Sequence, residues 1–210
     1  MTGSDRMIKI CGITRLTDAL HAVREGATAI GFVFWPGSPR CVDPALAGEI
    51  AGALPGDVTT VGVFVNEPID GIRRIAKMVG LRMVQLHGQE PPAYVDEIDQ
   101  PVMRSVTLDT VVDAAHAWPS DTTLLLDSSD PVRSGGHRPT VDWSRAAIVA
   151  RECRIVLAGG LTPENIEEAI MTVRPFGVDV SSGVESRPGV KDFEKVSLFV
   201  SNARAAFTQR

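Results

Sequence analysis

Eight short apolar runs, separated by segments of helical character, constrain the fold of this chain more than any other feature. Several runs, such as Ala29–Phe34 and Thr123–Leu126, are nearly continuous in Val, Ile, Leu and Phe, as is typical of strands buried on both faces. The predicted strands are Met7–Cys11, Ala29–Phe34, Thr60–Val65, Met83–Leu86, Val102–Val106, Thr123–Leu126, Ile155–Leu157 and Gly177–Ser181. The predicted helices are Thr17–Glu25, Pro44–Ala53, Ile69–Val79, Pro91–Ile98, Thr110–Ala117, Trp143–Ala150, Pro163–Val173 and Phe193–Ala206.

This alternation predicts an α/β fold, a single-domain (β/α)8 TIM barrel that occupies residues 1–210. The barrel is compact, because the fold typically takes about 250 residues. An open doubly wound sheet is the alternative, but it would more naturally carry Gly-x-Gly-x-x-Gly after the first strand, where this chain has none. Gly26 and Gly80 are predicted to end helices, and Pro91-Pro92 and Pro163-Glu164 to form first turns.

The composition argues against several classes of partner. The net charge is −5 and no lysine or arginine block is present, which disfavours nucleic acid and anionic membranes. No apolar run approaches the roughly 18 residues of a membrane span, and no signal-like leader precedes Ile8. Three cysteines leave at least one unpaired. We therefore expect a reduced, cytoplasmic protein, and the sequence does not distinguish a monomer from a small homo-oligomer.

Two potentially catalytic residues stand where predicted strands end. Cys11 closes the first apolar run, and Asp127 follows the sixth. All strand ends of a parallel barrel open onto one face, so a thiol and a carboxyl that are distant in sequence can meet at one pocket. One group can remove a proton while the other donates one, which is the minimum requirement for an isomerase.

The last two strand ends are predicted to bind phosphate. Gly159 and Gly160 lie between a strand and a helix start, and Ser181, Ser182 and Gly183 follow the last strand. Glycines allow backbone N–H groups to approach oxygens, and serine hydroxyls add donors. Each motif alone is better explained as a tight turn or a helix cap. Together, after strands seven and eight of a barrel, they favour a phosphate site.

A metal site is not expected. The four histidines, His21, His87, His116 and His137, show no ligand spacing such as His-x-x-x-His, and this also disfavours a metal-dependent pentose-phosphate epimerase. His87 is instead predicted to line the pocket beside Gln85. Asp179, near the end of the last strand, is predicted to hold ribose hydroxyls, with a structural hydrogen bond as its alternative.

A set of motifs extends along nearly the whole chain. The motifs are Lys9–Thr14, Gly31–Phe34 with Ser38–Arg40, Val61–Asn66, Val84–Gly88, Leu126–Ser128, Ala158–Asn165 and Val180–Glu185. In sequence and in order, this set resembles the phosphoribosylanthranilate isomerase family.

The resemblance implies a cofactor-free enzyme of tryptophan biosynthesis. Its reaction is an Amadori rearrangement of N-(5′-phosphoribosyl)anthranilate, a small-molecule phosphoribosyl substrate, to 1-(2-carboxyphenylamino)-1-deoxyribulose 5-phosphate. The resemblance assigns the general base to Cys11 and the general acid to Asp127. It also favours Arg40 as the group that binds the anthranilate carboxylate, for which a guanidinium is a bidentate match.

One segment departs from the family pattern. The family usually has Gly-Gly-Thr-Gly after strand six, whereas this chain has Gly135-Gly136-His137-Arg138 followed by Pro139. A loop that has lost a glycine and gained a proline is expected to close differently over the substrate. The alternative function is therefore a phosphoribosyl-binding barrel with reduced or altered isomerase specificity.

Overall fold

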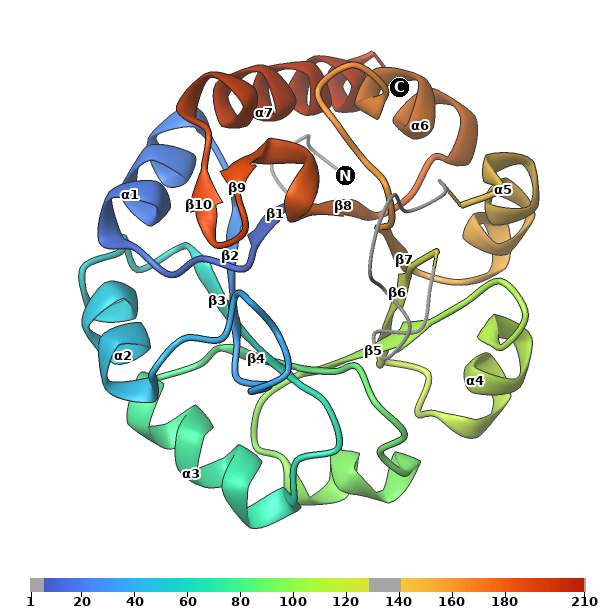
Figure 1. Cartoon of the computed structure of the whole chain (residues 1–210). Coiled ribbons are helices and arrows are strands. Elements are labelled where there is room, and N and C mark those ends of the chain that lie inside the picture. Colours follow the sequence, from blue (N-terminus) through green and yellow to red (C-terminus); the bar gives the residue numbers. More distant parts are fainter. Residues whose placement is uncertain (1–5, 129–140, 210) are drawn as a thin grey trace.

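The computed structural model describes residues 6–128 and 141–209. Eight parallel strands close into a barrel in chain order, from β1 to β8, and the helices surround it as an outer ring (Figure 1). The strands are β1 (Met7–Cys11), β2 (Ala29–Val33), β3 (Thr59–Phe64), β4 (Met83–Leu86), β5 (Val102–Val106), β6 (Thr123–Leu126), β7 (Ile155–Leu157) and β8 (Gly177–Val180). The predicted (β/α)8 barrel is confirmed, and each predicted strand lies within one residue of the observed one at either end.

Seven α-helices are described, together with a short antiparallel hairpin after β8. The helices are α1 (Leu16–Glu25), α2 (Pro44–Gly52), α3 (Ile69–Val79), α4 (Val111–Ala117), α5 (Trp143–Glu152), α6 (Ile166–Val173) and α7 (Phe193–Thr208). The hairpin is formed by β9 (Glu185–Arg187) and β10 (Val190–Lys191) and lies over the barrel beside β1 (Figure 1). Gly26 and Gly80 end α1 and α3 in the left-handed conformation, as predicted.

Two predicted helices were wrong in type or extent. The segment between β4 and β5 is a 3-10 helix, Pro92–Glu97, because it is short and its two prolines supply no N–H donors. The helix after β7 begins at Ile166 rather than at Pro163. Asn165 causes this delay, since its side chain accepts from Thr162 N at 2.8 Å and donates to the Gly160 carbonyl at 2.9 Å. These bonds hold a turn ahead of the helix.

The barrel interior consists of layers that follow the two-residue alternation of each strand. An apolar floor is formed by Met7, Ala29, Val61, Met103, Leu125, Val156 and Ala158. Two residues further along β1 the interior becomes polar, since Lys9 meets Asp179 of β8 and Gln85 of β4. Two residues further again, Cys11 packs with Val33 and Val63. Side chains that face outward form the larger core beneath the helices. The floor therefore closes one end of the barrel and leaves the polar layers open towards the other.

Among residues 6–128 and 141–209, no helix is long and apolar enough to cross a membrane.

Candidate active site

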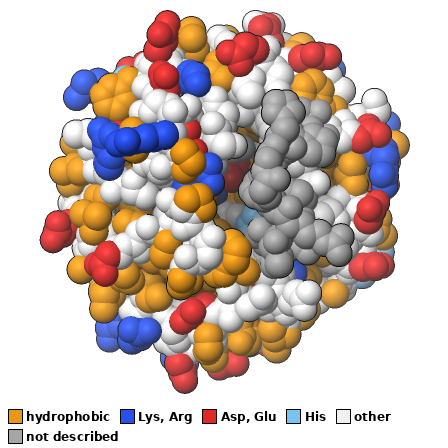
Figure 2. All heavy atoms as spheres, in the orientation of Figure 1, with side chains coloured by type: hydrophobic (Ala, Val, Ile, Leu, Met, Phe, Trp, Pro, Cys, Tyr) orange, Lys and Arg blue, Asp and Glu red, His pale blue; other side chains and the backbone are white. Residues whose placement is uncertain are grey.

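The candidate site lies at the carboxyl ends of the barrel strands. Figure 2 shows that this face is hollowed at its centre, with carboxylate and histidine atoms visible in the hollow. Cys11 ends β1, and Asp127 follows β6 directly, so both candidate catalytic residues belong to this end of the barrel. Both are buried, with 8% of Cys11 and 7% of Asp127 exposed.

Lys9 is the centre of the polar layer, and sequence reasoning did not select it as a site residue. It is completely buried, and its ammonium group donates to Asp179 Oδ1 at 3.1 Å and to Gln85 Oε1 at 2.9 Å. Burial by itself would lower the pKa of Lys9, but the neighbouring Asp179 and Cys11 together raise it. Lys9 is therefore an ammonium ion inside the barrel. A lysine in an otherwise apolar strand was the available signal, because lysine is almost never fully buried without a partner.

Hydrogen bonds continue from this layer towards Asp127. The Gln85 amide lies 3.0 Å from His87 Nδ1 and donates to Ser105 Oγ at 3.1 Å, and Ser105 Oγ is 2.8 Å from the same His87 nitrogen. His87 Nε2 is 3.9 Å from Asp127 Oδ2. The structure thus joins the predicted residues Gln85, His87, Asp127 and Asp179 into one cluster, to which it adds Lys9 and Ser105.

Cys11 lies at the opposite side of this cluster. Burial raises the pKa of the Cys11 thiol, while Lys9 and Lys191 act in the opposite direction. The thiol packs against Val33 and Val63, with Trp35 beside them. The arrangement gives the site a buried thiol with an apolar wall on one side and a buried ammonium ion on the other.

The predicted phosphate loops adjoin one another after β7 and β8. Gly159 and Gly160 both adopt the left-handed conformation, with φ of 80° and 67°, which favours glycine. A Cβ on Gly159 would lie 2.6 Å from Ser128 N. At Gly183 a Cβ would overlap the carbonyl oxygen of Leu161. Glycine at position 183 therefore lets the loops after β7 and β8 approach each other this closely, and glycine at position 159 does the same for the segments after β6 and β7.

Ser181 and Ser182 complete this group of residues. Ser182 begins the 3-10 turn Ser182–Val184, directly after β8 and Ser181. The hydroxyl of Ser181 is buried and has no hydrogen-bond partner among the residues that the structure describes. A hydroxyl in this state is available to a ligand oxygen.

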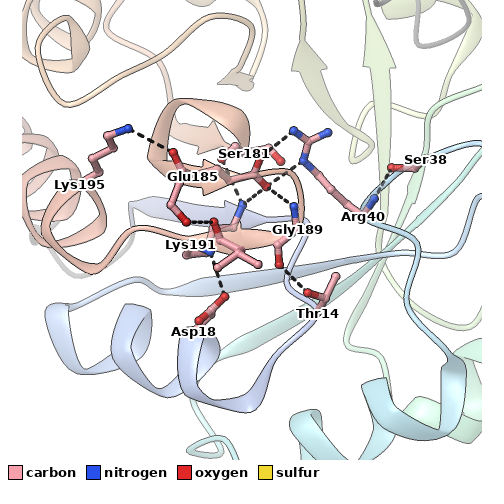
Figure 3. A network of polar contacts seen from close by, with 11 residues as sticks. Thr14, Asp18, Ser38, Arg40, Ser181, Glu185, Gly189, Lys191 and Lys195 are labelled. Carbon is pink, nitrogen blue, oxygen red and sulfur yellow. Dashed lines mark hydrogen bonds and ion pairs between the residues drawn. The ribbon is translucent and has the colours of Figure 1, made fainter.

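Arg40 is fixed by a carboxylate that sequence reasoning did not select. Figure 3 shows Glu185 between Arg40 and Lys191. The carboxylate of Glu185 accepts from Arg40 Nε at 2.9 Å, from Arg40 Nη2 at 2.7 Å and from Lys191 Nζ at 3.0 Å. Lys191 also donates to the carbonyl of Ser181 at 3.1 Å, so the same network holds the β8 loop. Burial by itself would raise the pKa of Glu185, but the donors of Arg40 and Lys191 lower it.

The Arg40 stem also lies beside the catalytic candidate of β1. A Cβ on Gly12, the residue after Cys11, would lie 2.5 Å from Arg40 Cδ and 3.0 Å from Ser181 Oγ. Arg40, the phosphate loop and the end of β1 therefore converge on one place. Signals for Glu185 were weak in the sequence, because a glutamate beyond the last strand looks like an ordinary loop residue.

No cluster of three or more potential metal ligands occurs in the described part of the chain. The altered segment Gly135–Thr140, including His137 and Arg138, lies outside the described residues.

A closed (β/α)8 barrel with a cluster of buried ionisable side chains and glycine-containing loops at the carboxyl ends of its strands is the architecture of a barrel enzyme. Residues 8–202 match the family model described as N-(5′-phosphoribosyl)anthranilate (PRA) isomerase. The chain belongs to this family, and it is an isomerase of tryptophan biosynthesis.

This chain is similar to members of the family in both sequence and structure. N-(5′-phosphoribosyl)anthranilate isomerase of Geobacter sp. (strain M21) is 46% identical over 199 residues, which cover 94% of this chain and 97% of the relative. The crystal structure of the Thermotoga maritima enzyme has 43% identity and a TM-score of 0.88, and covers 95% of this chain and 99% of that chain. A further structure, solved with reduced 1-(o-carboxyphenylamino)-1-deoxyribulose 5-phosphate, has 42% identity and a TM-score of 0.85, with the same coverage.

Proposed function

We propose that this chain converts N-(5′-phosphoribosyl)anthranilate to 1-(2-carboxyphenylamino)-1-deoxyribulose 5-phosphate with Cys11 as general base and Asp127 as general acid. The observation that carries this assignment is the placement of both groups, buried, at the strand ends that surround one hollow of the barrel. The paired glycine loops beside them support the same substrate, because a phosphate and an acid–base pair at one face fit a phosphorylated sugar.

The acid step opens the ribose ring. A proton must reach the ring oxygen as the bond from C1′ to that oxygen breaks, which gives a Schiff base. We assign this proton to Asp127, whose Oδ1 accepts from Ser128 N at 2.6 Å and whose Oδ2 faces His87 at 3.9 Å. Ser128 N keeps Oδ1 oriented, and we assign the proton transfer to the substrate to Oδ2.

The base step removes the proton from C2′ and gives an enolamine, which tautomerises to the ketone. The base must be the thiolate of Cys11, since a neutral thiol cannot accept the proton. Because burial raises the pKa of this thiol, the free protein holds it mainly as the thiol near neutral pH. The charges around Cys11 therefore decide how much base is present.

Two anionic groups of the substrate have separate binding partners in this proposal. Gly159, Gly160 and residues 181–183 bind the phosphate, and Arg40 binds the anthranilate carboxylate through the guanidinium edge that Glu185 leaves free. Gln85, His87 and Asp179 line the space between them, and Asp179 holds the ribose hydroxyls. We further propose that the protein works in the cytoplasm, without a cofactor, as a monomer or small homo-oligomer. A related structure with 41% identity contains monomers generated from the dimeric enzyme of Thermotoga maritima.

Turnover of fresh substrate is the direct test. N-(5′-phosphoribosyl)anthranilate, made in the cuvette from anthranilate and phosphoribosyl pyrophosphate, should lose its fluorescence at a rate proportional to the concentration of this protein. The same assay without the protein supplies the spontaneous rate. Loss of fluorescence no faster than this background, in protein that binds the reduced product analogue, would support the alternative of a phosphoribosyl-binding barrel.

Replacing Gly183 with alanine should weaken phosphate binding. The new Cβ would overlap the Leu161 carbonyl, so the loops after β7 and β8 must separate. We expect KM to rise about 10-fold or more, since charge-assisted hydrogen bonds contribute about 1.5–3 kcal/mol each. Calorimetry with inorganic phosphate should show the same loss. Gly52→Ala in α2 is the matched control, because a Cβ there meets nothing within 4 Å. An unchanged phosphate affinity in Gly183→Ala would place the phosphate elsewhere.

A further inference from the structure

Lys9 is a buried cation to which the proposed reaction assigns no step. It lies two residues before Cys11 on β1, so both side chains point into the barrel. The neighbouring strand gives them room through Gly31, which is the register partner of Cys11. A Cβ on Gly31 would lie 2.8 Å from Cys11 Sγ and 3.0 Å from Lys9 Cε. The thiol and the lysine stem therefore pack side by side over one glycine.

The ammonium group of Lys9 also interacts with Cys11. An ammonium group has three donors. Asp179 accepts from Lys9 at 3.1 Å and Gln85 accepts at 2.9 Å, and Lys9 also makes a side-chain hydrogen bond with Cys11. Cys11 is among the groups that raise the pKa of Lys9, and Lys9 in turn acts against the rise in the pKa of Cys11. The two ionisations are thus coupled.

Other charged groups also face Cys11, and they act in both directions. Lys191 of β10 favours the thiolate, and Asp179 of β8 disfavours it. Arg40, beside Gly12, is neutralised by its ion pair with Glu185 at 2.7 Å. Of these neighbours, Lys9 has the largest effect on the pKa of Cys11, and it is also the closest to Cys11 along the chain.

We propose that Lys9 is a positioning residue that stabilises the thiolate of Cys11 and so sets how much general base the protein holds near neutral pH. Lys9 touches no reacting atom in this role and acts through Cys11 alone. The link to catalysis rests on the proposed function, whereas the ionisation of the thiol can be measured in the free protein.

A purely structural role for Lys9 makes a different prediction. If Lys9 served only to neutralise Asp179 and close the barrel, removal of either partner would disturb the interior in the same way. If Lys9 stabilises the thiolate, removal of the two partners must shift the ionisation of Cys11 in opposite directions. Lys9→Met removes the cation that favours the thiolate, and Asp179→Asn removes the anion that competes for that cation.

The experiment measures how fast iodoacetamide alkylates Cys11 from pH 6 to about 11.5, in protein with Cys41→Ser and Cys153→Ser, because the pKa of the parent thiol is already raised. The midpoint of the pH profile is compared, rather than the rate, because nucleophilicity itself changes with the pKa of a thiol. Relative to the parent, Lys9→Met should move the midpoint up by at least about one pH unit. A full charge a few ångströms away would shift it by about two to three units at an effective dielectric constant of about 20, and Asp179 offsets part of the effect of Lys9. Asp179→Asn should move it down.

Lys195→Met is the matched control. This lysine is exposed on α7 and donates to the backbone carbonyl of Glu185 at 3.1 Å, so its loss should leave the midpoint unchanged. Should Lys9→Met fail to fold because Asp179 is left unpaired, the double variant Lys9→Met with Asp179→Asn removes both charges. Its midpoint should still lie above that of the parent, because Lys9 affects Cys11 more than Asp179 does.

Three outcomes would overturn the proposal: an unchanged or lowered midpoint in Lys9→Met, an unchanged or lowered midpoint in the double variant, or shifts of the same sign in Lys9→Met and Asp179→Asn. Failure of the proposed function is a separate result, since it would appear as absent turnover in the parent whatever the midpoints are. If the proposed function and the role of Lys9 both hold, the rising limb of the pH profile of kcat/KM in Lys9→Met should shift to higher pH. The shift should match that of the thiol midpoint.

Discussion

Replacing Cys11 with serine is expected to lower kcat by about 100-fold or more while leaving the affinity for the reduced product analogue nearly unchanged. Serine keeps the shape of the residue, but its hydroxyl is far too weak an acid to supply an equivalent base near neutral pH. General bases contribute about 10²-fold or more to a rate. Steady-state turnover and calorimetry separate the two quantities. Cys41→Ser is the control, because Cys41 is an exposed free cysteine.

The pH dependence of kcat/KM provides a second test of Cys11 as the general base. Burial raises the pKa of the Cys11 thiol in the free protein. Since the base must be deprotonated to act, kcat/KM should rise with pH, and the rising limb should extend above the ordinary thiol pKa of about 8.5. Retention of more than about a tenth of the parental kcat in Cys11→Ser would remove Cys11 from the base role. A rising limb of kcat/KM that is the same in Cys11→Ser as in the parent would do so too.

Replacing Asp127 with asparagine is expected to be comparably severe. The amide preserves the hydrogen bond that Ser128 N donates to Asp127 Oδ1 at 2.6 Å, but its N–H protons are too weakly acidic to be delivered to the ring oxygen. We expect kcat to fall by about 10²- to 10⁴-fold, the range typical of general acids, with little change in affinity for the reduced product analogue.

The control for Asp127 is Asp43→Asn, an exposed aspartate that caps α2 by accepting from Ala45 N at 2.8 Å. Asparagine caps helices about as well as aspartate, so turnover should not change. Near-normal activity in Asp127→Asn would assign the acid to another group, and His87, 3.9 Å from the same carboxylate, would be the first to examine.

The strand pattern was predictable because each strand of a barrel is buried on both faces. Continuous runs such as Met7–Cys11 and Ile155–Leu157 therefore marked the strands with correct bounds. Helix ends were predicted where a single residue decides them, as at Gly26 and Gly80. The start of α6 was missed because it depends on the side-chain bonds of Asn165 to its own turn, which no period in the sequence reports.

The candidate site also has some features that were predictable from the sequence and others that were not. The sequence itself determined that Cys11 and Asp127 stand at strand ends, that a glycine pair follows the seventh strand and that small residues follow the eighth, since these are properties of neighbouring residues. The roles of Lys9 and Glu185 were decided only by the tertiary structure. Lys9 meets Asp179, 170 positions away, and Glu185 meets Arg40, 145 positions away.

The first of these contacts depends on how β1 pairs with β8 when the barrel closes, which sets Lys9 opposite Asp179. A shift of one residue would turn every side chain of the strand to its other face. The sequence therefore fixes which residues can ionise, whereas the register of the closed barrel decides which charges face one another.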